Sequence, residues 1–442
     1  MNSLALSTDL YELTMMAGYV TAGLTPRASF ELYVRDLPRH RSFLVAAGLE
    51  QALDYLEALR FSEADIEHAR SLPALQSVRG DFFDDYLRHF RFTGDVWAVE
   101  EGTPVFPPAP LLRVTAPLPE AQLVETALLA HVGFETSVAS RAARVVRAAA
   151  GRAVVEFGAR RAHGIEAGVL AARAAFVAGC AATSSVEAGR RFGIPVSGTM
   201  AHSWVTSFPD EITAFRAYAE VFGDRAVLLL DTYDTLAAAR SIVASGLRPQ
   251  AVRLDSGNLL ALSRRVRAIL DEGGLAGTQI ILSGDLDEWR IEEIVRSGAP
   301  VDAFGVGAAL STASDAPSLG AIYKLVEIER NGADVPIMKR SVGKETRPGR
   351  KQVWRIVDGG MAIEDVIELA DETIALPGVR PLLTRVMAGG KRVSPSPAAA
   401  GLRDRHRAAL AELPEAVRRL EDPAPYRVRF GSALGGLLEQ RR

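Results

Sequence analysis

The stretch Ile194-Pro-Val-Ser-Gly-Thr-Met-Ala-His-Ser-Trp204 joins a short apolar run to a small-residue loop that presents one histidine. The chain turns at Gly198, and His202 stands just before a helical segment. A strand followed by such a loop is how α/β enzymes place a reactive group at the carboxyl edge of a parallel sheet. A single loop histidine is more often an ordinary surface residue, so the stretch is informative only if other strand ends match it.

Similar apolar runs recur after Gly151 and alternate with amphipathic helical segments. Their spacing of roughly 20–30 residues is typical of βα units in a parallel sheet. About seven such units predict an α/β fold built on an incomplete (β/α) barrel, with an open doubly wound sheet as the alternative. The predicted strands are 154–157, 175–178, 194–197, 226–230, 251–254, 280–283 and 301–304.

The residues that follow these runs share a chemical character, because almost every run ends in glycine, a hydroxyl group or a charge. In a parallel barrel such loops converge on one face, where active sites lie. We therefore expect one shared site, formed by the loops 157–161, 182–185, 198–202, 231–235, 253–258, 283–287 and 305–309.

The loops indicate the chemistry of this face. Ser283-Gly-Asp285 and Gly305-Val-Gly307 precede helical segments, so their backbone amides suit a sugar phosphate. A dinucleotide fingerprint does not fit the second loop, because Leu310 occupies the place of the third glycine. Carboxylates suited to ribose hydroxyls or to a Mg²⁺ ion that clamps diphosphate are Asp231, Asp234, Asp255 and Asp285. For any one of these aspartates, capping of the next helix is an equally good explanation.

Three arginines, Arg160, Arg161 and Arg253, suit bidentate binding of an anionic substrate or of diphosphate. The ring of Phe157 beside Arg160 suits a flat aromatic acid. The residues alone thus predict an α/β-barrel enzyme that acts on a phosphorylated sugar with Mg²⁺, and they leave the second substrate open.

The rest of the chain divides around this barrel. Residues 1–150 predict an N-terminal α/β domain, and residues 151–320 form the barrel domain. Residues 321–442 are a C-terminal segment that we expect to return to the N-terminal β layer. The expected elements outside the barrel are helices within 1–25, 50–92, 119–150 and 402–421, and strands at 28–34, within 92–114 and at 323–328.

Composition excludes several classes of protein. Of the 442 residues, 48% are hydrophobic and 24% charged, as in soluble globular proteins. The net charge of −3 gives no sign of nucleic acid or an anionic membrane as a partner. With no basic leader before an apolar core and no apolar run of the ~20 residues a membrane span needs, we expect a cytoplasmic protein. Cys180 is the single cysteine of the sequence, so an intramolecular disulfide is impossible, and we expect its thiol to be buried and unreactive.

Several short motifs match one known family in order. They are Thr8-Asp-Leu-Tyr-Glu-Leu-Thr-Met15, Ala47-Gly-Leu-Glu50, Glu156-Phe-Gly-Ala-Arg160, Gly198-Thr-Met-Ala-His202, Asp231-Thr-Tyr-Asp234, Arg253-Leu-Asp-Ser-Gly257 and Pro348-Gly-Arg-Lys351. On these motifs the chain resembles the nicotinate phosphoribosyltransferases over nearly its whole length. The resemblance implies a type II phosphoribosyltransferase, with an incomplete barrel, an N-terminal α/β domain and a homodimer whose active sites are shared between subunits.

The resemblance also implies the reaction. Nicotinate attacks C1 of 5-phosphoribosyl 1-diphosphate, diphosphate leaves, and nicotinate mononucleotide forms on the salvage (Preiss-Handler) route to NAD. Such a transition state needs charge clamps and a held aromatic nucleophile, and little acid–base chemistry. Family members act as ATP-dependent, ligase-type enzymes through a phosphohistidine, for which His202 is the matching position. Mg²⁺ is the implied cofactor and ATP the co-substrate.

Matching the family's motifs to this chain assigns the other site residues. Phe157 and Tyr11 sandwich the pyridine ring, with Tyr11 coming from the partner subunit. Arg160 and Arg253 contact the nicotinate carboxylate or the diphosphate. The implied catalytic residues are His202, Asp255 and Arg253. Further implied substrate contacts are Ser184, Thr199, Asp231, Ser256, Gly257, Gly284, Asp285, Gly305 and Gly307, and additional candidates for diphosphate or ATP are Arg35, Lys344 and Lys351.

Two positions bear on specificity. Ser184 stands where related nicotinamide-using enzymes carry an aspartate, and a carboxylate there would repel nicotinate, so serine favours the acid. Ala308-Ala309 departs from the hydroxyl or glycine expected after Gly-Val-Gly, which removes one side-chain donor from the phosphate site.

Other functions remain open on the sequence. The nearest is transfer to nicotinamide or quinolinate, although quinolinate should require more basic residues around Phe157. A metal-dependent barrel hydrolase would use His202 with Asp231 and Asp255, but none of the seven histidines is paired at i, i+2 or i, i+4. A non-catalytic relative that binds nucleotides is a third class.

Overall fold

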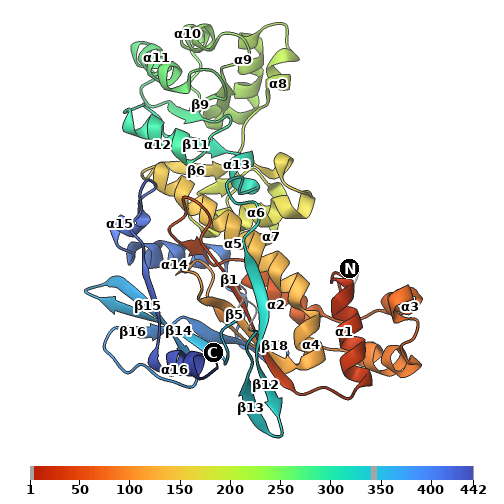
Figure 1. The fold of residues 1–442 in the computed structure, drawn as a ribbon. Coiled ribbons are helices and arrows are strands. Elements are labelled where there is room, and N and C mark those ends of the chain that lie inside the picture. Colours follow the sequence, from red (N-terminus) through yellow and green to blue (C-terminus); the bar gives the residue numbers. More distant parts are fainter. Residues whose placement is uncertain (1–3, 340–345, 442) are drawn as a thin grey trace. The chain divides into compact units, whose positions relative to one another are not determined.

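The structure is a computed structural model that describes residues 4–339 and 346–441 (Figure 1). The chain forms two compact units. Unit 1 comprises Met1–Ser137, Ser318–Pro397 and Arg405–Arg442, and unit 2 comprises Val138–Pro317 and Ala398–Asp404.

Unit 2 is built on a parallel sheet. Its strands are β6 (Ala153–Glu156), β7 (Ala182–Thr183), β8 (Val227–Leu229), β9 (Ala251–Leu254), β10 (Gln279–Leu282) and β11 (Ala303–Val306). Within the described residues these six strands follow the order β7-β6-β11-β10-β9-β8, and every neighbouring pair is parallel. Because β7 and β8 do not pair with each other, the described strands form an open, parallel half-barrel sheet of six strands, and the predicted barrel of about seven strands is not confirmed.

The prediction of seven strands is wrong in two places. Residues 175–177 are the last turn of α6 (Ile165–Val177), whose residues from Gly168 onward are buried. A helix buried all round loses the periodicity that distinguishes it from a strand. Residues 194–197 contribute only the single bridge between Thr183 and Val196, and Pro195 has no N–H to extend the ladder.

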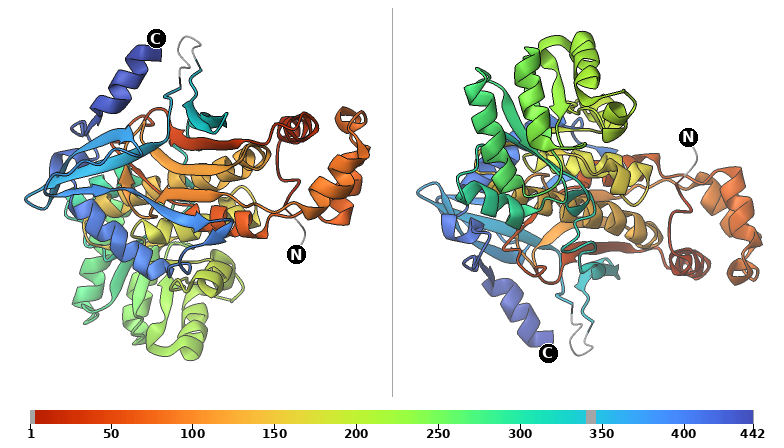
Figure 2. Two further views of the ribbon diagram at one scale, coloured as in Figure 1. Left: turned by 90° about the horizontal axis from the view of Figure 1, so that it is seen from below. Right: turned by 90° about the horizontal axis from the view of Figure 1, so that it is seen from above.

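Helices connect the strands of unit 2. Those after α6 are α7 (Val186–Phe192), α8 (His202–Thr206), α9 (Glu211–Phe222), α10 (Thr235–Ser245), α11 (Leu259–Glu272), α12 (Glu288–Arg296) and α13 (Ala308–Ser311). Helices α9, α10 and α11, green in Figures 1 and 2, lie side by side. The strands bury a continuous apolar core that includes Val154, Leu228, Val252, Ile280 and Phe304. Cys180 is also fully buried and burial raises the pKa of its thiol, as predicted.

Unit 1 contains an antiparallel sheet whose strands come from both the N-terminal and the C-terminal part of the chain. Its strands are β1 (Arg27–Val34), β3 (Asp95–Val99), β5 (Pro110–Pro117), β12 (Ala321–Arg330), β13 (Ala333–Pro336), β17 (Leu383–Ala388) and β18 (Lys391–Arg392). They follow the order β13-β12-β1-β5-β3-β17-β18 in the described chain, and β12 pairs antiparallel with β1 (Figure 1). The prediction that the C-terminal segment returns to the N-terminal β layer is therefore confirmed.

The remaining described elements are two smaller sheets and a set of helices. Smaller sheets join β2 (Leu44–Val45) to β4 (Pro104–Val105), and β14 (Lys351–Asp358) to β15 (Met361–Leu369), β16 (Val379–Pro381) and β19 (Arg427–Phe430). The helices are α1 (Leu10–Thr21), α2 (Leu49–Ala58), α3 (Glu63–Ser71), α4 (Leu118–Leu123), α5 (Glu125–Ala148), α14 (Ala399–Ala411), α15 (Glu415–Arg418) and α16 (Ser432–Arg441). Both α5 and α14 begin or end in unit 2. The single helix predicted over 402–421 is broken at Pro414, which cannot continue a helix.

Candidate active site

The carboxyl ends of the parallel strands of unit 2 carry most of the predicted site residues. Phe157 follows β6, Ser184 follows β7, and Asp255 follows β9. Because all six strands run in one direction, these residues lie at one edge of the sheet. The prediction that the strand-end loops gather on one face is confirmed for unit 2.

His202 is the first residue of α8 and lies between two other strand-end loops. Its Nδ1 atom is 3.2 Å from the hydroxyl oxygen of Thr232, which follows β8. Its Nε2 atom is 4.0 Å from a carboxylate oxygen of Asp255. The Thr232 contact engages Nδ1 and leaves Nε2 as the ring nitrogen that faces a carboxylate.

Asp255, next to His202, and Asp231 each accept a hydrogen bond from a serine hydroxyl. Ser283 donates to Oδ1 of Asp255 at 2.5 Å, and Ser256 donates to Oδ2 of Asp231. The backbone N–H of Asp255 also donates to that oxygen of Asp231. Among the described residues, Oδ1 of Asp231 is buried and accepts no hydrogen bond. A buried carboxylate oxygen without a donor is suited to a cation or a substrate hydroxyl.

Arg253 lies on β9 beside these carboxylates. Burial lowers the pKa of Arg253, whereas the charges of Asp255 and Asp231 raise it, and the positive charge of Arg160 lowers it further. The Nε atom of Arg253 is buried without a hydrogen-bond partner in the described part of the chain. Arg160, on the loop after β6, is exposed. The two cations therefore meet the predicted need for positive charge near the aspartates.

Glycine is required at two of the predicted positions. At Gly305, a Cβ atom would lie 2.4 Å from the ring of Phe157. At Gly284, where φ is +90°, a Cβ atom would lie 1.7 Å from the carbonyl oxygen of Asp255. The first glycine lets the Phe157 ring lie against the backbone of β11, and the second lets the loops after β9 and β10 touch.

The loops that carry Phe157 and Ser184 meet at a buried carboxylate. Glu156, the last residue of β6, is fully buried and accepts from the Gly158 N–H and from the Thr183 hydroxyl, the latter at 2.7 Å. The Ser184 N–H donates to the carbonyl of Glu156 at 2.9 Å. Glu156 begins the motif Glu156-Phe-Gly-Ala-Arg160, and no role was predicted for its side chain.

Other predicted residues have mixed outcomes. Asp234 caps α10 by accepting from two backbone N–H groups, so helix capping explains it. Thr199 donates to the carbonyl of Val227 at 2.7 Å, which holds its loop against β8. Asp285 has a φ of +46°, which is unusual for a non-glycine residue and exposes its side chain beyond β10. Ser256 and Gly257 are exposed after β9, and Gly307 follows β11.

Two charged residues near the site, Glu211 and Arg141, were not predicted from the sequence. Glu211, the first residue of α9, is half-buried, and burial together with Asp234 and Asp231 raises its pKa to about 7. Arg141 on α5 forms ion pairs with Glu288 at 2.7 Å and with Asp315 at 3.0 Å. Glu288 follows the Gly284 loop and Asp315 follows the Gly307 loop, so the Arg141 side chain joins the segments after the two loops predicted to bind phosphate. The partners of Glu211 and of Arg141 are distant in the sequence, so neither set of contacts could be predicted from it.

Some predicted residues lie outside this cluster. Tyr11 belongs to α1 of unit 1, where the residue is 45% exposed, and its stacking on the pyridine ring stays a prediction. Arg35 follows β1 in unit 1 and is also exposed. Lys344 lies outside the described residues.

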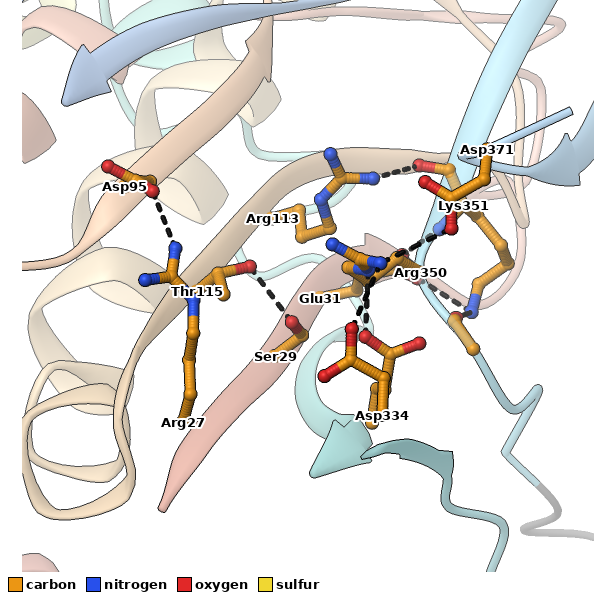
Figure 3. A network of polar contacts seen from close by, with 12 residues as sticks. Arg27, Ser29, Glu31, Asp95, Arg113, Thr115, Asp334, Arg350, Lys351 and Asp371 are labelled. Atoms are coloured by element: carbon orange, nitrogen blue, oxygen red, sulfur yellow. Dashed lines mark hydrogen bonds and ion pairs between the residues drawn. The ribbon is translucent and has the colours of Figure 1, made fainter. Parts of the chain in front are cut away.

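The structure contradicts the role predicted for Lys351. Its ammonium group is buried and lies 2.9 Å from Oε2 of Glu31, and it also donates to the carbonyls of Arg347 and Gly349. Figure 3 shows Lys351 within a network that includes Glu31 and Arg113. A lysine with these buried partners holds the start of β14 against β1, so the prediction that it contacts diphosphate or ATP is wrong.

The half-barrel and its edge of carboxylates, hydroxyls, arginines and one histidine define an α/β enzyme of the type that handles phosphorylated substrates. Residues 153–368 match the nicotinate phosphoribosyltransferase family, residues 6–133 match its N-terminal domain, and residues 377–437 match its C-terminal domain. The chain therefore belongs to the nicotinate phosphoribosyltransferase family.

Individual relatives agree with this membership. The chain is 43% identical to nicotinate phosphoribosyltransferase pncB2 of Mycobacterium tuberculosis, over 99% of this chain and 94% of that protein. It is 44% identical to the nicotinate phosphoribosyltransferase of Bacillus subtilis, over 84% of this chain and 78% of the relative. The crystal structure of human nicotinic acid phosphoribosyltransferase superimposes with a TM-score of 0.85 at 30% identity, covering 99% of this chain and all of that one. No described helix is long and apolar enough to cross a membrane.

Proposed function

We propose that this chain catalyses the transfer of the 5-phosphoribosyl group from its 1-diphosphate to the ring nitrogen of nicotinate, and couples this step to ATP hydrolysis through His202. The C1–diphosphate bond breaks, the N–C1 bond forms, and nicotinate mononucleotide and diphosphate leave, as in the Preiss-Handler route to NAD. The observation that carries the proposal is the placement of the His202 ring between the Thr232 hydroxyl and the Asp255 carboxylate.

His202 is the proposed phosphoryl acceptor. The ring nitrogen that carries no proton attacks the γ-phosphoryl group of ATP, with Thr232 beside Nδ1 and the Asp255 carboxylate 4.0 Å from Nε2. ADP leaves with the former bridging oxygen, and water later releases phosphate from the histidine. The negative charge of Asp255 favours a positively charged imidazole ring while the phosphoryl group moves.

The pyridine site is proposed on the loops after β6 and β7. Phe157, whose ring is packed against Gly305, offers an aromatic ring for stacking with the pyridine. Arg160 offers a cation for the nicotinate carboxylate. Ser184 places a neutral hydroxyl on the neighbouring loop, which suits an acid better than a carboxylate would. Tyr11 of the partner subunit would cover the other face of the pyridine ring in a homodimer.

Sugar and diphosphate would bind along the loops after β8 to β11. Asp255 and Asp231 suit the ribose hydroxyls, and the backbone at Gly284 and Gly307 suits phosphate oxygens. The described residues contain no group of three or more His, Cys, Asp or Glu side chains arranged to hold a metal ion. This arrangement suits Mg²⁺, which proteins commonly hold through one or two carboxylates together with substrate phosphates.

In such an arrangement Asp231, with its unpartnered Oδ1 atom, is the carboxylate best suited to the ion. Bound Mg²⁺ would neutralise charge on the leaving diphosphate. The side chains of this chain would orient that group, with Arg253 supplying a fixed positive charge beside Asp255.

The proposal is tested by incubating the protein with nicotinate, the sugar diphosphate and Mg²⁺, with and without ATP, and measuring nicotinate mononucleotide. We expect product in both reactions and faster formation with ATP. His202→Ala should retain slow product formation and lose the stimulation by ATP. Product from nicotinamide or quinolinate but not from nicotinate would overturn the substrate assignment, and unchanged ATP stimulation in His202→Ala would overturn the role of the histidine.

A further inference from the structure

Glu156 is a buried carboxylate that the proposed reaction does not use. It ends β6, which lies between β7 and β11 in the sheet, and its side chain has no exposed surface. Burial raises the pKa of Glu156, while the hydrogen bonds from Thr183 and Gly158 lower it. An apolar side chain would occupy this place at less cost, since burying a carboxylate is unfavourable unless its oxygens are well partnered.

The two oxygens of Glu156 serve different loops. Oε1 accepts from the N–H of Gly158, the second residue of the loop that carries Phe157 and Arg160. Oε2 accepts from the hydroxyl of Thr183, the last residue of β7, and that hydroxyl accepts in turn from the Ser185 N–H at 3.0 Å. One side chain therefore joins the loop of Phe157 to the loop of Ser184.

The Phe157 loop is held at further points, and the Glu156 carboxylate is the side chain that joins it to β7. The Phe157 N–H donates to the carbonyl of Val306 at 2.8 Å, and Ser311 donates to the carbonyl of Gly158 at 3.2 Å. Both of those contacts attach the loop to β11 and α13. The backbone pairing of β6 with β7 ends at Glu156 and Thr183. Beyond that pair, the Ser184 N–H donates to the Glu156 carbonyl, and the Glu156 carboxylate adds a side-chain connection to both loops.

We propose that Glu156 is a positioning residue for the pyridine substrate, which sets the spacing between the Phe157–Arg160 loop and the Ser184 loop through its hydrogen bonds to Gly158 and Thr183. The inference rests on the proposed function, because it takes those two loops as the pyridine site. It predicts that Thr183 acts through Glu156 and that loss of this link weakens nicotinate binding selectively.

The test compares Thr183→Val, which removes the hydroxyl, with Thr183→Ser, which keeps it. Kinetics with each substrate varied give separate KM values for nicotinate and for the sugar diphosphate. Thr183→Val should raise the nicotinate KM about five- to tenfold, the equivalent of one hydrogen bond, and leave the other KM within about twofold. Thr183→Ser should behave like the wild type. An unchanged nicotinate KM in Thr183→Val, or an equal rise in both KM values, would overturn the proposal.

Variants of Glu156 provide the second arm. Glu156→Gln should stay within about threefold of the wild-type nicotinate KM, because its amide oxygen accepts from Gly158 and its NH₂ donates to a rotated Thr183 hydroxyl. Glu156→Leu should raise the nicotinate KM at least tenfold, and adding Thr183→Val should cause no further rise, since both changes break one link. Additive effects in the double variant would contradict a shared action.

Failure of this inference is distinguishable from failure of the proposed function. If Glu156→Leu does not fold, as judged by near-UV circular dichroism, the Thr183 pair and Glu156→Gln still decide the question. A wild-type protein that forms no nicotinate mononucleotide refutes the proposed function. A wild-type protein that forms it, with a Thr183→Val variant of unchanged nicotinate KM, refutes only the role of Glu156.

Discussion

An Nη2 atom of Arg141 lies 2.7 Å from Oε2 of Glu288, and both side chains are almost completely buried, with 4% and 1% of their surface exposed. Glu288 begins α12, directly after the Gly284 loop, and Arg144 also contacts it at 3.1 Å. The same Arg141 side chain reaches Asp315 beyond the Gly307 loop. A buried ion pair thus lies behind two loops proposed to bind phosphate.

Replacing Arg141 with Met should destabilise the protein by about 3 kcal/mol, because it leaves Glu288 with a reduced share of buried positive charge. It should also raise the KM of the sugar diphosphate more than that of nicotinate. Urea denaturation and steady-state kinetics measure the two effects. The matched control is Arg190→Met, which breaks the exposed pair of Arg190 with Glu187 and should change neither quantity. Equal effects of the two substitutions would contradict the importance of burial.

Replacing Ser184 with Asp should lower kcat/KM for nicotinate by at least about tenfold, because two carboxylates would face each other in a partly buried site. The ratio of nicotinamide to nicotinate activity should rise. Product formation from each pyridine measures this ratio. Ser184→Ala, which adds no charge, should leave the ratio near the wild-type value. A Ser184→Asp variant with unchanged preference would place the pyridine carboxylate away from this loop.

Replacing Gly305 with Ala should raise the nicotinate KM about tenfold or more, because the added methyl group would lie 2.4 Å from the present position of the Phe157 ring. The ring must rotate or move outward to accept it. Gly277→Ala offers a control in the same unit, since no atom lies within 4 Å of a Cβ at that exposed turn. We expect wild-type kinetics from Gly277→Ala, and a nicotinate KM unaltered in Gly305→Ala would contradict stacking on Phe157.

Glu12 should make the stability of the protein depend on pH. It lies buried on α1 and accepts from the N–H and hydroxyl of Thr126, and burial raises its pKa to about 7. The native state therefore binds a proton that the unfolded chain has already lost above about pH 4.5. The free energy of unfolding contributed by this group is greatest below that pH and falls as the pH rises through about 7.

Glu12→Gln should remove this component, because the amide resembles the protonated carboxyl group. Urea denaturation at pH 5 and pH 8 measures it as the difference between wild type and variant, which cancels the parallel contribution of Glu211. Glu67→Gln, at an exposed position on α3, is the control and should keep the wild-type pH dependence. A wild-type slope in Glu12→Gln would show that Glu12 titrates normally.

The sequence predicted the active edge better than the number of strands. Strand ends such as Asp255 and Ser283 were identified because one direction of all strands brings their ends together, whatever the count. The strand predicted at 175–178 was wrong because α6 is buried on all sides, so its apolar residues carry no helical period. Pro195 reduced the next predicted strand to one bridge, a loss that depends on where its neighbour Thr183 lies.

Partners distant in the sequence could not be predicted at all. Lys351 was predicted to contact diphosphate or ATP, but it pairs with Glu31, 320 positions earlier, inside unit 1. Arg350 also points toward carboxylates, including that of Asp334, in the network of Figure 3. A charged residue buried by a partner several hundred positions away looks the same in sequence as one that awaits a substrate.

The origin of the unit 1 sheet has a consequence for synthesis on the ribosome. Strands β1, β5 and β3 emerge early, yet β12 must cover one side of this group and β17 the other. The early strands present two unpaired edges until residue 330 has been translated, and the edge of β3 stays unpaired until residue 388, so other chains can be recruited there. Unit 2 is nearly continuous in sequence and can fold in the meantime. A nascent chain halted before β17 should therefore contain a finished half-barrel joined to a sheet prone to aggregation.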